Sequence, residues 1–213
     1  MDIISLNETY NTAYTNKLVA HKHIFDELYN ECGTTFMRGC GSYLFDGQTY
    51  TYCDIMYKKQ ELLFTSAKKA SRVLEIGTYM GHSLFIMLLA NPTLKITCID
   101  IDDRYTGPAV KVLNKYFNNA ITFIHNDSLE ALKSLSDTFD FFHIDGHHVN
   151  SYIDREFTLI QRLNESSDNI LRVIFDDQDC MIPLQNDIEK QFTVLTKIIP
   201  KCKWNNVYYE LKL

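Results

Sequence analysis

The stretch "VLEIGTYMGHS", residues 73–83, contains a short apolar run, a turn with two glycines and the start of a second apolar run. The residues before Gly77 predict a buried strand, and "HSLFIMLLA", residues 82–90, predicts a helix. Gly77 permits a tight turn, and Gly81 lets the start of the helix approach a ligand closely. The segment therefore predicts a strand, a turn and a helix with a ligand site at the turn.

The chemistry of this turn differs from that of dinucleotide-binding enzymes. Its glycines have the spacing G-x-x-x-G rather than G-x-G-x-x-G, and Glu75 precedes them. A carboxylate so close to the turn is unfavourable for a phosphate and favourable for a cationic, amino-acid-like ligand. The turn therefore favours a ligand with an amino-acid moiety.

From about residue 54, short β-rich runs alternate with helical runs. This alternation is typical of an α/β fold, in which a mostly parallel sheet has helices on both faces and ligands at the carboxyl ends of its strands. Only "PKCKWNN" separates the last two strands, which is too short for a helical crossover, so they are expected to pair antiparallel. The predicted strands lie at 72–76, 95–100, 121–124, 139–144, 172–175, 192–199 and 207–213.

Composition excludes several classes of function. The formal net charge is -6 and the basic residues are scattered, which argues against partners such as nucleic acid or an anionic membrane. The longest apolar run is too short to span a bilayer, and the amino terminus lacks the layout of a signal peptide. The six cysteines form no CxxC pair, as expected for thiols in a reducing compartment, so we predict a cytoplasmic protein.

Acids also follow the second and third predicted strands. Asp100 ends the second strand, where it can accept hydrogen bonds from a ribose diol, and Asp127 follows the third, where it can accept from an exocyclic amine. An aspartate before a helix is also a common N-cap, so each acid alone has a structural alternative.

Together, "VLEIGTYMGHS", "CIDID", "HNDSLEAL", "FDFFHIDGHHVNSYIDREF" and "VIFDD" resemble class I S-adenosylmethionine-dependent methyltransferases from about residue 54 to the end. The resemblance implies a Rossmann-like class I methyltransferase fold with S-adenosylmethionine as cofactor. It places Asp100 at the ribose, with Asp102 as the alternative, and Asp127 at the adenine. The cofactor-binding residues that it implies are Glu75, Gly77, Thr78, Tyr79, Gly81, Ser83, Asp100, Asp127 and Ser128.

The fourth and fifth predicted strands end in three carboxylates, Asp145 and the pair Asp176 and Asp177. In a 3-2-1-4-5 strand order these ends are neighbours, because adjacent strands lie ~4.8 Å apart. Three close carboxylates repel one another, and a hard divalent cation such as Mg²⁺ relieves that conflict. Helix capping, or an ion pair with an arginine such as Arg155, is the alternative.

"HIDGHH" and "IFDDQD" resemble the metal-dependent O-methyltransferases that act on small hydroxylated molecules, including sugars of natural products. By this resemblance Asp145, Asp176 and Asp177 hold Mg²⁺ (or Mn²⁺), and His148, three residues after the first acid, is the general base. His148 and Asp145 are thus the implied catalytic residues. The favoured acceptor is a hydroxyl of a sugar or nucleotide-sugar, with a catechol-like molecule second.

The other histidines have simpler expectations. His143 alternates within a strand and is expected to be packed, while His82 follows the glycine turn and borders the cofactor at most. His147 is a less natural ligand for Mg²⁺ than for Zn²⁺.

Residues 1–53 precede the methyltransferase-like segment, 54–213, and predict a helical and loop extension. We expect this extension to be a lid over the substrate or a contact in a homo-oligomer. Tyr43, Tyr50 and Tyr52 lie in its glycine-containing loop, where lid residues and surface or interface aromatics are equal alternatives.

Three functions are compatible with these features. The leading hypothesis is an enzyme that moves a methyl group from S-adenosylmethionine to a hydroxyl of a small molecule. An NAD(P)-dependent oxidoreductase is disfavoured by the missing G-x-G-x-x-G and by Glu75. A non-catalytic cofactor-binding module is disfavoured by the acids that end the fourth and fifth predicted strands, where the resemblance places the metal ion.

Overall fold

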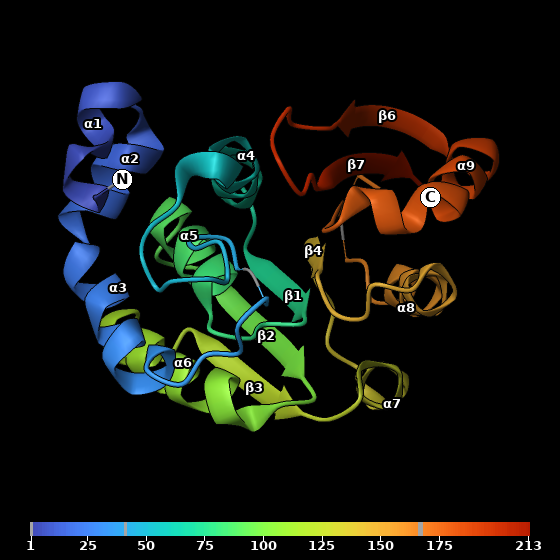
Figure 1. The fold of residues 1–213 in the computed structure, drawn as a ribbon. Helices are drawn as coiled ribbons and strands as arrows, with labels where there is room; N and C mark the ends of the chain where they lie inside the picture. Colours follow the sequence, from blue (N-terminus) through green and yellow to red (C-terminus); the bar gives the residue numbers. More distant parts are fainter. Residues whose placement is uncertain (1, 41, 166–167) are drawn as a thin grey trace.

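A computed structural model describes residues 2–40, 42–165 and 168–213 (Figure 1). Its sheet has seven strands in the order β3-β2-β1-β4-β5-β7-β6. Strands β1 to β5 pair in parallel, and β7 is antiparallel to both β5 and β6. The predicted Rossmann-like sheet with an antiparallel last strand is confirmed. The strands are β1 (Arg72–Ile76), β2 (Lys95–Asp100), β3 (Ile121–His125), β4 (Phe141–Ile144), β5 (Ile170–Phe175), β6 (Thr193–Ile198) and β7 (Val207–Lys212).

Helices cover both faces of this sheet, with α4 to α6 in one layer and α7 to α9 in the other (Figure 1). The α-helices of the described residues are α1 (Leu6–Thr9), α2 (Ala13–Ala20), α3 (Lys22–Leu28), α4 (Tyr57–Ala67), α5 (His82–Ala90), α6 (Asp103–Tyr116), α7 (Ser128–Ser134), α8 (Asn150–Gln161) and α9 (Ile182–Gln191). Within the described ranges, none of them has the length and hydropathy of a membrane span.

The central strands are apolar on both sides because both of their faces are covered. In β1, Val73 packs into the hydrophobic cluster under α4 to α6, whereas Leu74 and Ile76 pack into the cluster under α7 to α9. A near-continuous apolar run is the expected pattern for a parallel strand in this position. The sheet thus divides one core into two layers.

The residues before α4 belong to the first of these layers. Leu6, Tyr14 and Leu18 are fully buried in the same cluster as the residues of α5, and α2 and α3 contact α5 and α6 respectively. Tyr43 and Tyr52 are 2% and 4% exposed. They are therefore core residues rather than surface aromatics.

The third tyrosine of this loop is also packed inward. The hydroxyl of Tyr50 lies 2.7 Å from Nε2 of His82, whose side chain is fully buried. The Tyr50 ring also stacks on Phe45. The loop before α4 is thus anchored to the start of α5.

The glycine turn touches the end of β4 at Gly77. Gly77 has a φ of +78°, and a Cβ on it would lie 2.5 Å from the carbonyl carbon of Asp145 and 2.6 Å from Cα of Gly146. Its neighbour Ile76 accepts a hydrogen bond from the Asp145 N–H at 2.8 Å. A side chain at position 77 would therefore separate the turn from the strand end that carries the predicted catalytic residues.

We expect Gly77→Ala to lower the free energy of unfolding by more than the ~1–2 kcal/mol that a left-handed backbone costs a residue with a Cβ, because the new methyl group also meets backbone atoms. Gly107→Ala is the matched control, since no atom lies within 4 Å of a Cβ there. Alanine in that helix should be neutral or stabilising. Urea denaturation measures both variants, and equal unfolding midpoints would contradict the close-contact argument.

Candidate active site

A cavity of about 850 Å³ lies at the carboxyl ends of β1 to β5. Its volume suits a cofactor together with a small second molecule. The predicted site residues that line it are Gly77, Thr78, Tyr79, Ser83, Asp100, Asp102, Asp127, Ser128, Asp145, His148, Asp176 and Asp177. Glu75 and Gly81, two predicted cofactor contacts, are not among the lining residues.

Glu75 lies beneath the glycine turn rather than in the cavity. Its side chain is fully buried, one oxygen accepts from the Thr78 hydroxyl at 2.9 Å, and the other lies 2.8 Å from Nδ1 of His143. His143 is fully buried, as predicted. The predicted contact of Glu75 with an amino-acid moiety is therefore corrected: this carboxylate supports the turn from inside the protein.

Gly81 is required by helix packing. Its φ is +72°, and a Cβ on it would lie 3.0 Å from Cβ of Ala109 and 3.4 Å from Cδ1 of Leu113, both in α6. The close approach predicted at Gly81 is thus made by a neighbouring helix and not by a ligand.

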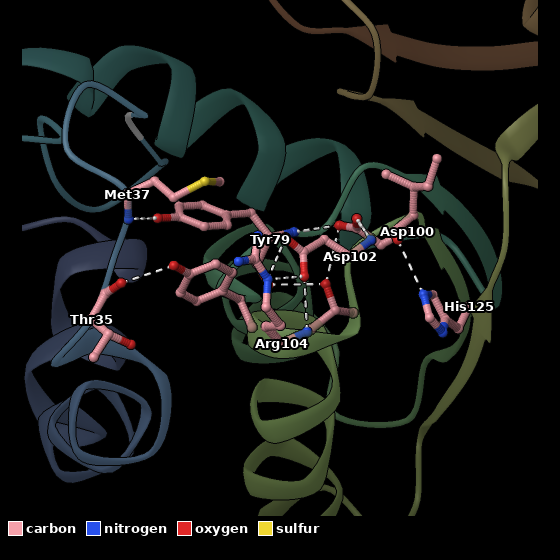
Figure 2. Close-up of polar contacts among 10 residues, drawn as sticks. Thr35, Met37, Tyr79, Asp100, Asp102, Arg104 and His125 are labelled. Carbon is pink, nitrogen blue, oxygen red and sulfur yellow. Dashed lines mark hydrogen bonds and ion pairs between the residues drawn. The ribbon is translucent and has the colours of Figure 1, made fainter.

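Asp100 and Asp102 make different contacts at the end of β2 (Figure 2). Oδ2 of Asp100 accepts from the backbone N–H groups of Thr78 and Tyr79, both at 2.8 Å, and Oδ1 accepts only from the Asp102 N–H among the described residues. Asp102 caps α6 and pairs with Arg104, whose hydrogen bonds lower the pKa of this carboxyl. Asp100 therefore keeps an acceptor site toward the cavity.

Two tyrosines hold the segment around Met37 beside the glycine turn (Figure 2). The hydroxyl of Tyr79 accepts from the Met37 N–H at 2.9 Å, and that of Tyr105 donates to the Thr35 carbonyl at 2.8 Å. Met37 and Cys40 line the cavity. The amino-terminal part of the chain thus supplies one wall of the site.

Asp127 is the N-cap of α7, which was the structural alternative for this acid. One of its oxygens accepts from the N–H groups of Leu129 and Glu130, and the other accepts from the Tyr152 hydroxyl. The Tyr152 hydrogen bond lowers the pKa of Asp127. Its carboxylate still lines the cavity.

Glu156 is a cavity residue that the sequence analysis missed. Its side chain is fully buried, Oε1 accepts from the Ser128 hydroxyl at 2.5 Å, and Oε2 has no hydrogen-bond partner among the described residues. Burial raises the pKa of Glu156 to about 7. Its signal in the sequence is an acid on the same face of the predicted helix as Ile153 and Ile160.

Asp176 forms a buried ion pair with Lys59 of α4. Nζ of Lys59 lies 2.7 Å from both carboxylate oxygens, and the two side chains are 4% and 6% exposed. The ammonium group also lies 4.5 Å from the centre of the Tyr43 ring. Burial lowers the pKa of Lys59, but the charge of Asp176 and its neighbours more than offsets this, so the pKa lies above its ordinary value.

The imidazole of His148 lies between the other two acids. Its Nδ1 is 2.8 Å from Asp177 and its Nε2 is 3.6 Å from Asp145. Interactions with Asp145 and Asp177 raise the pKa of His148 to about 11. Burial and the nearby Asp176 raise the pKa of Asp145 to about 7. Of these two groups, Asp145 is therefore the one whose pKa lies closer to neutral.

These contacts do not fit the predicted magnesium site. Both oxygens of Asp176 are bound to a lysine, and Asp177 lies 2.8 Å from Nδ1 of His148. No group of three or more His, Cys, Asp or Glu side chains in the described ranges is arranged to hold a metal ion. The expected repulsion between the carboxylates is instead relieved by Lys59 and His148. Arg155, the predicted alternative, lies over the Tyr152 ring.

Residues 74–168 match a family described as a methyltransferase domain. This match covers 95 of the 213 residues and indicates similarity to methyltransferase domains. No curated protein sequence matches this one.

Solved structures with a similar fold include the three that follow. An O-methyltransferase from Bacillus cereus in complex with SAH is 13% identical, with 90% of this chain and 91% of that chain covered and a TM-score of 0.65. The SAH-bound methyltransferase PaMTH1 from Podospora anserina is 15% identical, with coverage of 96% and 97% and a TM-score of 0.64. The O-methyltransferase TomG from Streptomyces achromogenes, involved in tomaymycin synthesis and in complex with SAM, is 18% identical, with coverage of 72% and 79% and a TM-score of 0.59.

Glu156 should make the stability of the protein depend on pH. Its folded-state pKa lies above the unfolded value, so the folded protein holds this proton longer and loses stability as the pH rises from about 4.5 to about 7. A shift of this size corresponds to a loss of up to about 3 kcal/mol. Glu156→Gln should remove the loss, so its advantage over the wild type should be larger at pH 8 than at pH 5.

Urea denaturation without ligand measures this difference, and Glu130→Gln is the control because Glu130 is exposed and pairs with Lys133. If Glu156→Gln raises the free energy of unfolding by the same amount at both pH values, the pKa of Glu156 is not raised.

Proposed function

We propose that this methyltransferase is an O-methyltransferase that transfers the methyl group of S-adenosylmethionine to a hydroxyl of a small molecule. The observation that carries this proposal is the common cavity, which joins the glycine turn to the cluster of Asp145, His148 and Asp177. The Gly77 turn touches the backbone of Asp145, so a cofactor held at the turn has its reactive end beside these groups.

The cofactor would lie along the ends of β1 to β3. We assign the ribose to Asp100, because Asp102 is engaged in capping α6 and in its pair with Arg104. Ile101 is 72% exposed and lines the cavity, which supports apolar contact with the adenine ring. Ser128 and the free oxygen of Glu156 are candidates for polar contacts at the adenine edge.

The acceptor would lie on the side of β4 and β5. Apolar and aromatic side chains, among them Met56, Tyr43 and Trp204, line this part of the cavity together with Lys59. Trp204 is 40% exposed and Lys203 lies over its ring, so a flat molecule or the C–H face of a sugar would pack on the other ring face. A sugar or nucleotide-sugar remains the favoured acceptor class, with a catechol-like molecule second. Magnesium has no part in this proposal.

In the proposed step, the acceptor oxygen attacks the methyl carbon, and the bond from that carbon to the sulfonium sulfur breaks. Alignment of these atoms in the cavity supplies much of the rate. The hydroxyl proton passes to the Asp145 carboxylate, and His148 stays protonated between Asp145 and Asp177. His148 thus acts with Asp145 rather than as the lone base expected from the sequence, because its pKa is far above neutral.

The proposed function is tested by turnover. The protein is incubated with S-adenosylmethionine and a panel of nucleotide-sugars, catechols and flavonoids, and products are analysed by mass spectrometry. We expect an acceptor that gains one methyl group on oxygen, with S-adenosylhomocysteine as the second product. Binding of S-adenosylhomocysteine without methylation of any acceptor would favour a non-catalytic module, and stabilisation by NADH alone would favour an oxidoreductase.

The pH dependence tests the proton acceptor. Activity should fall as the pH drops through about 7, because Asp145 becomes protonated there. His148→Ala should lower kcat by ~10²-fold and move this acidic limb to higher pH, because the hydrogen bond from His148 lowers the pKa of Asp145. Asp145→Asn should abolish the limb. If His148→Ala abolishes the limb while Asp145→Asn retains it, His148 alone is the base.

His147→Ala is the matched control for the pH experiment. His147 stacks on the Tyr152 ring at 4.8 Å and has no ion pair with Asp145 or Asp177 among the described residues. The position of the acidic limb should therefore not change in His147→Ala.

A further inference from the structure

A buried lysine lies among the three acids at the ends of β4 and β5. Lys59 is 4% exposed, lines the cavity and bonds both oxygens of Asp176. Isolated buried ammonium groups are costly, so a lysine in such a place needs compensating charge. Asp176 supplies that charge, and the pair is complete without any added ion.

The surroundings of Lys59 restrict where its ammonium group can go. The next residue, Gln60, is fully buried and donates to the Tyr43 carbonyl at 2.6 Å, while its side-chain oxygen accepts from the hydroxyls of Tyr14 and Tyr52. The Tyr43 ring lies against the ammonium group. Lys59 is therefore held in position on a helix whose register is fixed by buried hydrogen bonds.

We propose that the ammonium group of Lys59 is the resident cation of the acceptor site, where it takes the place of a divalent metal ion in this O-methyltransferase. An ammonium group has three N–H donors, and in the described part of the chain only Asp176 accepts from that of Lys59. A remaining donor is thus available to the acceptor oxygen, where it stabilises the negative charge that develops as the proton leaves. Methyl transfer by this protein is then independent of metal.

This inference rests on the proposed function and adds that the methyl transfer requires Lys59 and no metal ion. A metal-dependent enzyme would lose activity when the ion is removed, whereas this protein keeps its cation as part of the chain. The proton still passes to Asp145 and the methyl group still passes to the acceptor oxygen, so no further reactant is needed.

The first experiment uses the wild-type protein. Mn²⁺ binding is measured by electron paramagnetic resonance, and turnover is measured after exhaustive EDTA treatment and again with added Mg²⁺. We expect no stoichiometric Mn²⁺ binding, and turnover that EDTA and Mg²⁺ leave unchanged. One bound Mn²⁺ that Mg²⁺ displaces, or activity that requires Mg²⁺, overturns the inference and leaves the proposed methyl transfer intact.

The second experiment removes the cation. Lys59→Met should lower kcat by ~10²-fold or more, as loss of a donor to a developing oxyanion does, while the affinity for S-adenosylhomocysteine changes by less than about threefold. Lys59→Met should also gain Mn²⁺ binding, because the three carboxylates then have only His148 as a cation. Lys58→Met is the matched control, since Lys58 is exposed and pairs with Glu61. It should retain full activity and bind no Mn²⁺.

The result that would overturn the role of Lys59 is a folded Lys59→Met protein that binds S-adenosylhomocysteine and turns over at the wild-type rate without metal. Lys59→Arg keeps the charge and should retain more activity than Lys59→Met. If Lys59→Met does not fold, the wild-type Mn²⁺ and EDTA measurements decide the inference alone. If S-adenosylhomocysteine binds and no acceptor is methylated under any condition, the proposed function fails, and wild-type Mn²⁺ binding still tests the cation.

Discussion

The buried contact between Glu75 and His143 connects the parts of this protein that the site requires. Glu75 supports the glycine turn through Thr78, and His143, on β4, lies 2.8 Å from the Tyr43 hydroxyl on its other side. Asn206 donates to that same hydroxyl, which adds the end of the β6–β7 connection. One chain of buried polar groups thus joins the cofactor turn, the acid-bearing strand and the wall of the acceptor pocket. Every residue of this chain makes at least one hydrogen bond within it, and Oδ1 of Asn206 has no partner among the described residues.

The fold could be predicted because its signals are local. The apolar runs, the glycine turn and the short last connection predict the sheet and its antiparallel strand without knowledge of distant contacts. The same local signals did not distinguish the two glycines of the turn. Gly77 meets the end of β4, whereas Gly81 meets α6, and both appear in the sequence only as glycines before a helix.

The site residues that follow strands were predicted from the sequence. Those that lie on helices were missed. The positions of the acids along the sheet were inferred correctly, as was their mutual repulsion. The compensating cation was not, because Lys59 lies 117 residues before Asp176 and forms part of a lysine pair that resembles a solvated helix face. Glu156 was missed for a similar reason, since a single acid in an amphipathic helix is usually exposed.

The charges of the acid cluster and of the proposed cofactor balance one another. Three carboxylates with protonated Lys59 and His148 leave one net negative charge, and the sulfonium of the proposed cofactor carries one positive charge. When the methyl group leaves, the sulfur becomes neutral, and the proton taken by Asp145 neutralises the cluster. The total charge of the cavity is then the same before and after transfer. Lys59 supplies one of the two positive charges in this balance without an added ion.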